Sequence, residues 1–81
     1  MTKNNLIKIT GLPFGIAAKI VRIEGGHSVW ERLDEVGLHT GDYIKVIRQA
    51  PLQGPLLVRC NGQEIAIGRG IAAKILVQVA A

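Results

Sequence analysis

Few side chains in this sequence have the types and spacings that metal binding requires. The candidates are His27, His39 and the single cysteine, Cys60. Zinc and related sites draw histidine, cysteine and carboxylate ligands from short recurring patterns such as CxxC or HxxxH. Neither pattern occurs here. The three residues are therefore weak metal candidates, and we expect at most adventitious or weak binding of a divalent ion.

The sequence also lacks a convincing set of catalytic residues. Ser28 stands three residues before Glu31, the spacing of a capping box, so a helix N-cap explains it better than a nucleophile. Cys60 falls in a predicted strand beside a tight turn, where cysteine usually behaves as a small hydrophobe. Gly25 and Gly26 do not continue into a phosphate-binding loop. We therefore expect a protein that is not an enzyme and has no resident cofactor.

Length and composition indicate one small domain, residues 1–81, with an aliphatic core. Hydrophobic residues make up 48% of the chain but aromatic residues only 4%. The lone cysteine excludes an internal disulfide and suits a reducing cytosol. No apolar stretch approaches the roughly 20 residues of a membrane-spanning helix, and no signal peptide is evident. We expect a cytoplasmic protein that does not insert into the membrane.

The net charge of +4 raises the question of nucleic-acid binding. No two basic residues are adjacent, and no run of aromatic residues accompanies them, unlike the footprint of nucleic-acid binders. A solvated basic surface is the favoured interpretation, and weak nucleic-acid binding stays open as an alternative. The high apolar content suggests that some surface is buried against a partner or in a homo-oligomer.

Patterns of β-branched residues bounded by glycine and proline predict five to six short strands. In the segment 17–24, Ile20, Val21 and Ile23 cannot all face one side, which predicts a bulge. Asn61-Gly62 is a strong hairpin signal. The predicted strands cover Leu6 to Ile9, 17–24, about 42–49, Leu56 to Cys60, Gln63 to Ile67 and Ile75 to Val79.

One short α-helix is predicted at about 28–36, with a helical turn near 69–73. Val29, Leu33 and Val36 form its apolar stripe, and Gly37 stands where a left-handed C-cap is wanted. We expect positive φ also at the other turn glycines, Gly41, Gly54 and Gly62. These elements predict a small, partly closed β-barrel, with the helix across its open end.

The ordered elements resemble the ferrous iron transport protein A family, FeoA, over roughly residues 9 to 79. The sequence departs from the family pattern at Val36 and Ile67, where leucine is usual, and at Gly68 and Gly70, where helix formers are common. The stretches that carry the resemblance are IVRIEGG (20–26), RLDEVGLHTGDYIKVI (32–47), QGPLLVRCNGQEIAIG (53–68) and IAAKILV (71–77).

The resemblance implies an SH3-like barrel and a role as a small cytosolic accessory to FeoB, the membrane ferrous-iron transporter. It implies docking on the cytosolic part of FeoB, at the inner face of the membrane. The same domain follows a DNA-binding region in iron-dependent repressors of the DtxR type, so a regulatory or metal-binding module is the alternative. Residues considered for partner contact lie at or beside predicted turns: Leu38, His39, Pro51, Leu52 and Leu56. Leu38 is expected more in the core, and Leu52 is the better exposed contact.

Overall fold

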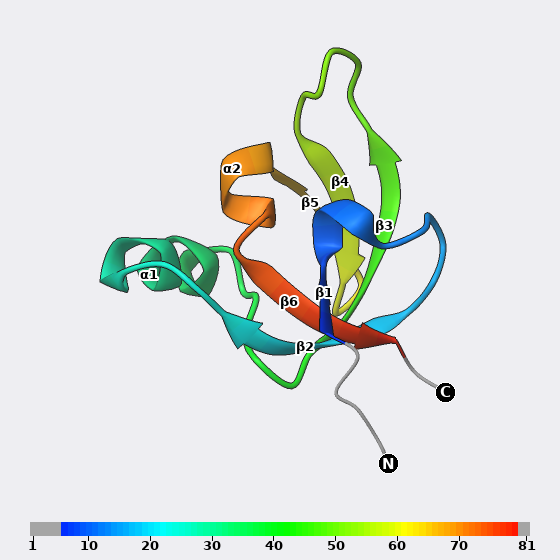
Figure 1. The fold of residues 1–81 in the computed structure, drawn as a ribbon. Helices are drawn as coiled ribbons and strands as arrows, with labels where there is room; N and C mark the ends of the chain where they lie inside the picture. Colours follow the sequence, from blue (N-terminus) through cyan, green and yellow to red (C-terminus); the bar gives the residue numbers. More distant parts are fainter. Residues whose placement is uncertain (1–5, 80–81) are drawn as a thin grey trace.

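The computed structural model describes residues 6–79, which form a small barrel of antiparallel strands with two short helices (Figure 1). The mainly β architecture predicted from the sequence is confirmed, and three strands have the predicted ends. The elements are β1 (Leu6–Lys8), the 3-10 turn η1 (Ile9–Gly11), β2 (Ala18–Ile23), α1 (His27–Glu35), β3 (Tyr43–Gln49), β4 (Leu56–Cys60), β5 (Gln63–Ile67), α2 (Arg69–Ala72) and β6 (Ile75–Val79).

The six strands form one sheet in the order β1-β6-β2-β3-β4-β5, and every pairing is antiparallel. Within residues 6–79, β1 and β5 are the two outer strands of this sheet. The barrel is therefore curled but not closed, which leaves two strand edges to be covered or used.

The predicted irregularity in β2 is present as a register shift against β6. The pairing skips one residue between Ile20 and Arg22, so Ile20 is fully buried while Val21 is 40% exposed. The backbone of Ile20 is hydrogen-bonded to the corner before β3. Its amide donates to the carbonyl of Asp42 (2.8 Å), and its carbonyl accepts from the amide of Gly41 (2.7 Å). The bulge resolves the conflict because it lets Ile20 and Ile23 face inward without Val21.

The core is aliphatic, as the composition predicts. All three aromatic side chains lie at the surface, with Phe14 59%, Trp30 49% and Tyr43 56% exposed. The largest side chains of the core that are almost completely buried are Ile9, Ile20, Leu33, Leu38, Ile44, Leu56, Ile75, Val46, Val58 and Val77.

Helix α1 begins one residue earlier than predicted, and the predicted capping box is wrong. Gly26 is the N-cap residue, in extended conformation, and no side chain caps the helix. The carbonyl of Gly26 accepts hydrogen bonds from the backbone amides of Val29 and Trp30. Ser28 thus lies inside the first turn, and Glu31 forms an ion pair with His27 at 3.3 Å instead of reaching back to an amide.

The end of α1 follows the predicted left-handed cap. Gly37 has φ +86°. Its amide donates a hydrogen bond to the carbonyl of Asp34, and the amide of Leu38 donates one to the carbonyl of Leu33. This pattern is a Schellman motif, which usually brings the residue after the glycine back against the helix. Leu38 is accordingly 1% exposed, so the expectation that it packs in the core is confirmed.

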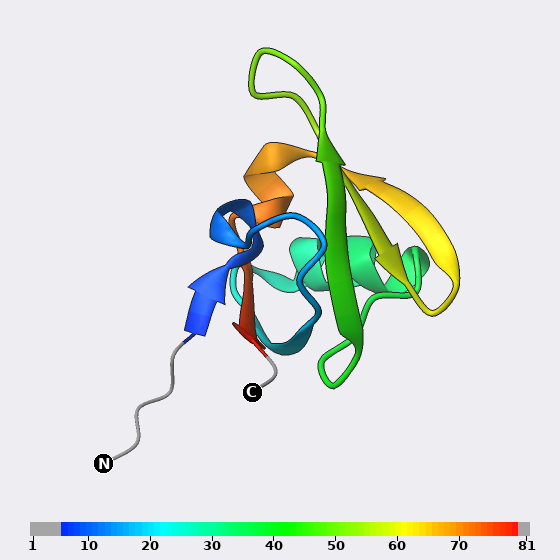
Figure 2. The same ribbon diagram turned by 90° about the vertical axis from the view of Figure 1, so that its right-hand side faces the viewer.

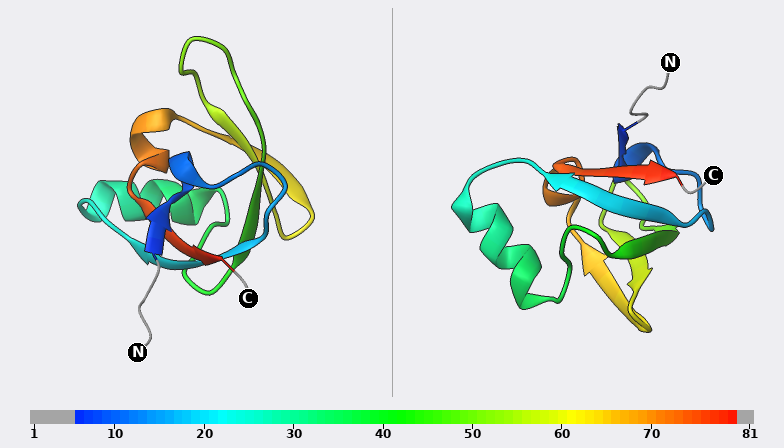
Figure 3. Two further views of the ribbon diagram at one scale, coloured as in Figure 1. Left: turned by 45° about the vertical axis from the view of Figure 1, so that its right-hand side comes forward. Right: turned by 90° about the horizontal axis from the view of Figure 1, so that it is seen from below.

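Helix α1 contacts the barrel along a narrower stripe than predicted and projects from its side (Figure 3). Leu33 is buried and Val29 half-buried, but Val36 is 42% exposed. Gly68 and Gly70 leave α2 as a helix of only four residues. Because both helices are short, the barrel end between them is incompletely filled.

The loop between β3 and β4 projects beyond the strands (Figure 2). Leu52 and Gln53 have φ values of +60° and +57°, whereas Gly54, predicted to need a positive φ, does not have one. The glycine is required for a different reason: a Cβ atom there would lie 2.9 Å from the Cβ of Ala50. Gly37, Gly41 and Gly62 have positive φ as predicted.

Candidate functional site

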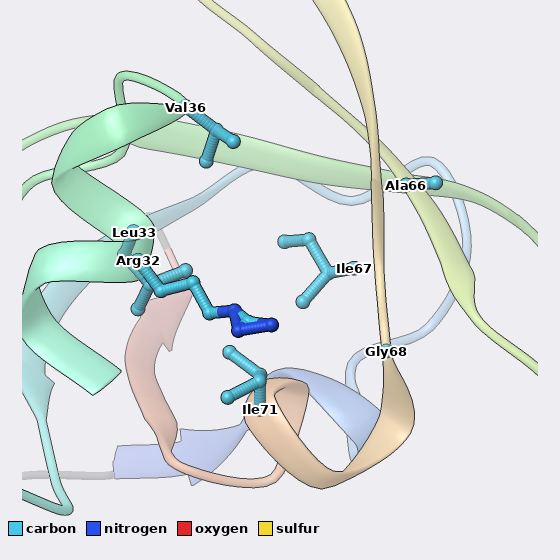
Figure 4. Close-up of a pocket in the computed structure, with 7 residues that line it drawn as sticks. All are labelled: Arg32, Leu33, Val36, Ala66, Ile67, Gly68 and Ile71. Carbon is cyan, nitrogen blue, oxygen red and sulfur yellow. The ribbon is translucent and has the colours of Figure 1, made fainter. Parts of the chain in front are cut away.

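A groove lies between α1 on one side and β5 with α2 on the other (Figure 4). Its volume is about 130 Å³. Figure 4 shows Val36 and Ile67 directed into it, while the Ala66 side chain points away. The lining residues are Arg32, Leu33, Val36, Ala66, Ile67, Gly68 and Ile71.

The single charged residue of the groove is Arg32. Arg32 and Val36 are four residues apart on α1 and therefore share one face of the helix. The Arg32 side chain runs across the groove, with its guanidinium close to Ile67 and Ile71 in Figure 4. Within residues 6–79 no ion pair involves Arg32. The groove thus combines apolar walls with one guanidinium group that can bind a carboxylate or carbonyl group of a partner.

The volume of the groove limits what it can hold. Pockets for cofactors and drug-sized molecules span roughly 300–1,000 Å³, and a cavity of about 150 Å³ accommodates benzene. A volume of 130 Å³ therefore matches one aliphatic or aromatic side chain. The site is suited to a side chain of another polypeptide and is too small for a nucleotide or a cofactor.

The residues predicted for partner contact divide into two groups. Leu38 and Leu56 are 1% and 2% exposed, so they belong to the core and offer no surface to a partner. For Leu38 this is the favoured prediction, whereas the assignment of Leu56 to a contact surface is wrong. Leu52 is 98% exposed, and Pro51 beside it is exposed as well. Pro51 and Leu52, at the tip of the loop between β3 and β4, therefore remain accessible to a partner, as predicted for Leu52.

His39 lies at the corner after α1 and interacts with acidic residues on both sides. Its Nε2 atom is 2.7 Å from Oδ1 of Asp34, and its Nδ1 atom is 3.7 Å from Oδ2 of Asp42. The amide of His39 also donates to Asp42 Oδ2 at 3.0 Å. These contacts connect the last turn of α1, through Asp34, to the residue before β3, Asp42.

The three weak metal candidates are not gathered into one site. His27 pairs with Glu31, His39 with Asp34, and Cys60 lies in β4. Among residues 6–79 no group of three or more His, Cys, Asp or Glu side chains is arranged to hold a metal ion.

Cys60 is 3% exposed and packs within the core cluster. Burial, and secondarily the nearby carboxylate of Asp42, raises the pKa of its thiol. A raised pKa keeps the group in the neutral, unreactive form. The sequence-based interpretation of Cys60 as a small hydrophobe is confirmed.

The outward face of β2, β3 and β4 carries several basic side chains. Lys19 stands opposite Tyr43, and Lys45 opposite Arg59, in the strand register. Arg59 is paired with Glu64. A hollow of about 180 Å³ here is more open than the groove and is lined by Ala17, Tyr43, Ile44, Lys45, Arg59, Cys60 and Asn61. Two basic side chains and an asparagine are among its lining residues, whereas the groove is lined by four large aliphatic side chains and a single cation, and on this ground we take the groove as the candidate site.

In the part of the chain that the structure describes, no helix has the length and apolar character to span a membrane.

The sequence reasoning missed the groove residues as a site. In that reasoning Arg32, Val36 and Ile67 were family-pattern positions, and Val36 was also part of the helix stripe. The i, i+4 spacing of Arg32 and Val36 places them on one helix face, but it does not show what that face meets. That Ile67 and Ile71 lie opposite is decided by the tertiary structure.

The chain is similar to known proteins in family, in sequence and in fold. The family model described as FeoA domain matches residues 7–79. The "Putative Fe(2+) transport protein A" of Methanocaldococcus jannaschii is 39% identical over 59 residues, covering 73% of this chain and 70% of that protein. The solution structure of the FeoA protein from Chlorobium tepidum has a TM-score of 0.83 and 35% identity, over 93% of this chain and 71% of that one.

A longer relative joins two proteins in one chain. It is the Fe(2+) transport protein A/Fe(2+) transporter FeoB fusion protein of Porphyromonas gingivalis, 34% identical over 73 residues. The match covers 90% of this chain but only 9% of the fusion protein. These similarities, with the strand order above, confirm the predicted SH3-like fold.

Proposed function

Because the chain belongs to the FeoA domain family, we propose that it is a non-catalytic adaptor of ferrous iron uptake that docks on the cytosolic part of a FeoB transporter. The groove between α1 and β5–α2 is the docking surface in this proposal. The observation that carries it is the combination of apolar walls, a single cation and a volume that fits one side chain.

The fusion protein supports association with FeoB. In that relative, a segment similar to this chain is covalently joined to the transporter. Two modules in one chain are held at a high effective concentration, so weak docking is enough. A separate chain must supply the affinity from its own surface, and an apolar groove with a charged rim can do so.

The energetics of the groove are consistent with reversible docking. Burying one aliphatic side chain stabilises a complex by about 1.5–3 kcal/mol, and a charge-assisted hydrogen bond from Arg32 adds about 1.5–3 kcal/mol. Association itself costs about 4–15 kcal/mol, so these two contributions give at most a weak complex, and further contacts with the partner have to supply the rest of the affinity.

Several features support a non-catalytic role in the cytoplasm. The groove lining offers one guanidinium and apolar groups, with neither a nucleophile nor a general base among its seven residues. The buried free thiol of Cys60 suits a reducing compartment. Docking would bring the chain to the inner face of the membrane without insertion. The proposal therefore accounts both for a cytoplasmic chain and for one held at the membrane surface.

The test is a titration of the chain into the purified cytosolic portion of FeoB from the same organism. Val36→Asp places a carboxylate at a groove position that is already 42% exposed, so the fold should tolerate it. Binding should weaken about tenfold or more, because one apolar contact of about 1.4 kcal/mol or more is lost. Val21→Asp is the matched control, since Val21 is 40% exposed on β2 and is not a groove residue.

Equal weakening in both variants would place the docking surface elsewhere. No binding by the unmodified chain, to this portion or to full-length FeoB in detergent, would refute the adaptor role.

A further inference from the structure

The groove includes an unpaired strand edge. Strand β5 is an outer strand of the sheet and pairs only with β4 within residues 6–79. Such an edge presents a row of backbone N–H and C=O groups that another extended chain can pair with.

The β4–β5 hairpin decides which residues present those groups. Asn61 and Gly62 form its two-residue turn, with φ +54° and +78°, and Cys60 is paired with Gln63. In a hairpin of this kind the pair flanking the turn is hydrogen-bonded, and hydrogen-bonded pairs then alternate along the strands. Gln63, Ile65 and Ile67 therefore direct their backbone groups to β4, while Glu64 and Ala66 direct theirs away from it.

The outward backbone groups of Ala66 border the groove. The Ala66 side chain points away from the other lining residues, whereas Ile67 points toward them (Figure 4). Ala66 nevertheless lines the groove, so it does this through its backbone. None of the backbone hydrogen bonds formed outside helices and strands in residues 6–79 involves Glu64 or Ala66.

We propose that the groove binds an extended segment of the FeoB partner by strand addition to β5, through the backbone of Glu64 and Ala66. This inference rests on the proposed docking function and specifies its geometry. Alternate side chains of the added strand would enter the groove beside Val36 and Ile71. Arg32 would meet a carboxylate or a backbone carbonyl of the segment, because it is the one cation of the groove.

Strand addition agrees with both the volume and the charge of the groove. Backbone hydrogen bonds supply affinity in this mode, and pockets for alternate side chains supply specificity. A groove of 130 Å³ holds one such side chain. The occupant is thus a segment with alternating apolar residues and an acidic residue near the one that is buried.

The test uses the two kinds of amide that alternate along one strand. In the free chain, the amides of Ile65 and Ile67 should be protected from hydrogen exchange by β4, and those of Glu64 and Ala66 should exchange rapidly. Adding the cytosolic portion of FeoB should slow exchange at Glu64 and Ala66 by about tenfold or more, since bound amides exchange only when the added strand opens.

A proline variant tests the same contact by affinity. Ala66→Pro removes an N–H group that points away from β4. Edge strands accept proline at such positions, and the proline ring would block the approach of another strand. Binding should weaken about tenfold or more. Val21→Asp, on β2 and away from the groove and the β5 edge, should bind within about twofold of the unmodified chain.

The outcomes separate the two proposals. If the complex forms but Glu64 and Ala66 still exchange rapidly, strand addition is overturned and docking stands. If folded Ala66→Pro binds as tightly as the unmodified chain, strand addition is likewise overturned. If the unmodified chain does not bind, both proposals fall. Should Ala66→Pro fail to fold, the exchange measurement on the unmodified chain decides.

Discussion

The Nε2 atom of His39 lies 2.7 Å from Oδ1 of Asp34, and this contact ties the corner after α1 to the last turn of the helix. A carboxylate near a helix C-terminus is unfavourable because it meets the negative end of the helix dipole. The imidazole of His39 gives this carboxylate a hydrogen-bond partner. His39 therefore has a structural role at this corner, in a pair whose side chains are 48% and 59% exposed.

The first prediction concerns the size of this contribution. Exposed ion pairs stabilise proteins by about 0.2–1 kcal/mol. A double-mutant cycle with His39→Ala and Asp34→Asn, followed by urea unfolding, should give a coupling energy in that range. The pair His27 and Glu31, on the first turns of the same helix, is the control and should give a smaller value at its distance of 3.3 Å. A coupling above about 2 kcal/mol would contradict a surface contact.

The second prediction contrasts two glycines near the ends of the helices. Gly37→Ala should lower the free energy of unfolding by about 1–2 kcal/mol, because an L-residue is strained at φ +86°. Gly70→Ala should raise it by about 0.4–1 kcal/mol, because Gly70 lies in α2 with free space for a Cβ atom. Chemical denaturation of both variants measures this, and a change of the same sign in both would contradict the conformational explanation.

The third prediction concerns neighbouring residues in the β3–β4 loop. Gln53→Gly should raise the free energy of unfolding by up to about 1 kcal/mol, because Gln53 has φ +57° and glycine adopts this conformation without strain. Gly54→Ala should lower it by about 1–3 kcal/mol, because the new Cβ atom meets Ala50 at 2.9 Å and the Pro51 carbonyl at 3.1 Å. Thermal unfolding of the two variants distinguishes them; stabilisation by Gly54→Ala would refute the packing argument.

The fourth prediction is the pH dependence that Cys60 introduces. Its pKa is higher in the folded chain than the ordinary 9.0, so the unfolded thiol ionises first. The contribution to stability is therefore complete below pH 9.0 and decreases as pH rises toward the pKa of the folded state. The difference in unfolding free energy between the unmodified chain and Cys60→Ala, measured from neutral pH upward, should shrink in this range.

Alkylation provides an independent measure of the same burial. The native thiol should react with iodoacetamide far more slowly than in urea, because it is 3% exposed and neutral. A native rate close to that of the unfolded chain would show that Cys60 is accessible.

Local patterns were sufficient for most of the secondary structure. Strands β4, β5 and β6 have the predicted bounds because alternating side chains and the Asn61-Gly62 turn act over a few residues. The same holds for the left-handed cap at Gly37. The predicted capping box does not form, since the helix begins at His27 after the N-cap Gly26 and Ser28 lies inside its first turn. A Cβ atom at Gly25 would meet Val29 and Lys74, so the start of the helix is close to a residue far along the chain, which local patterns do not report.

The amino-acid sequence alone thus establishes a small aliphatic barrel of the FeoA family, its strands and its helix. The tertiary structure alone shows that β5 is an edge, that Leu56 is buried, and that Arg32 faces Ile71 across a groove. The reason is physical: periodicity reports which side of an element is apolar, whereas edges and grooves arise from contacts between residues far apart in the chain. The contact between His39 and Asp34 is local by comparison, since the two residues are five apart and the turn at Gly37 brings them together.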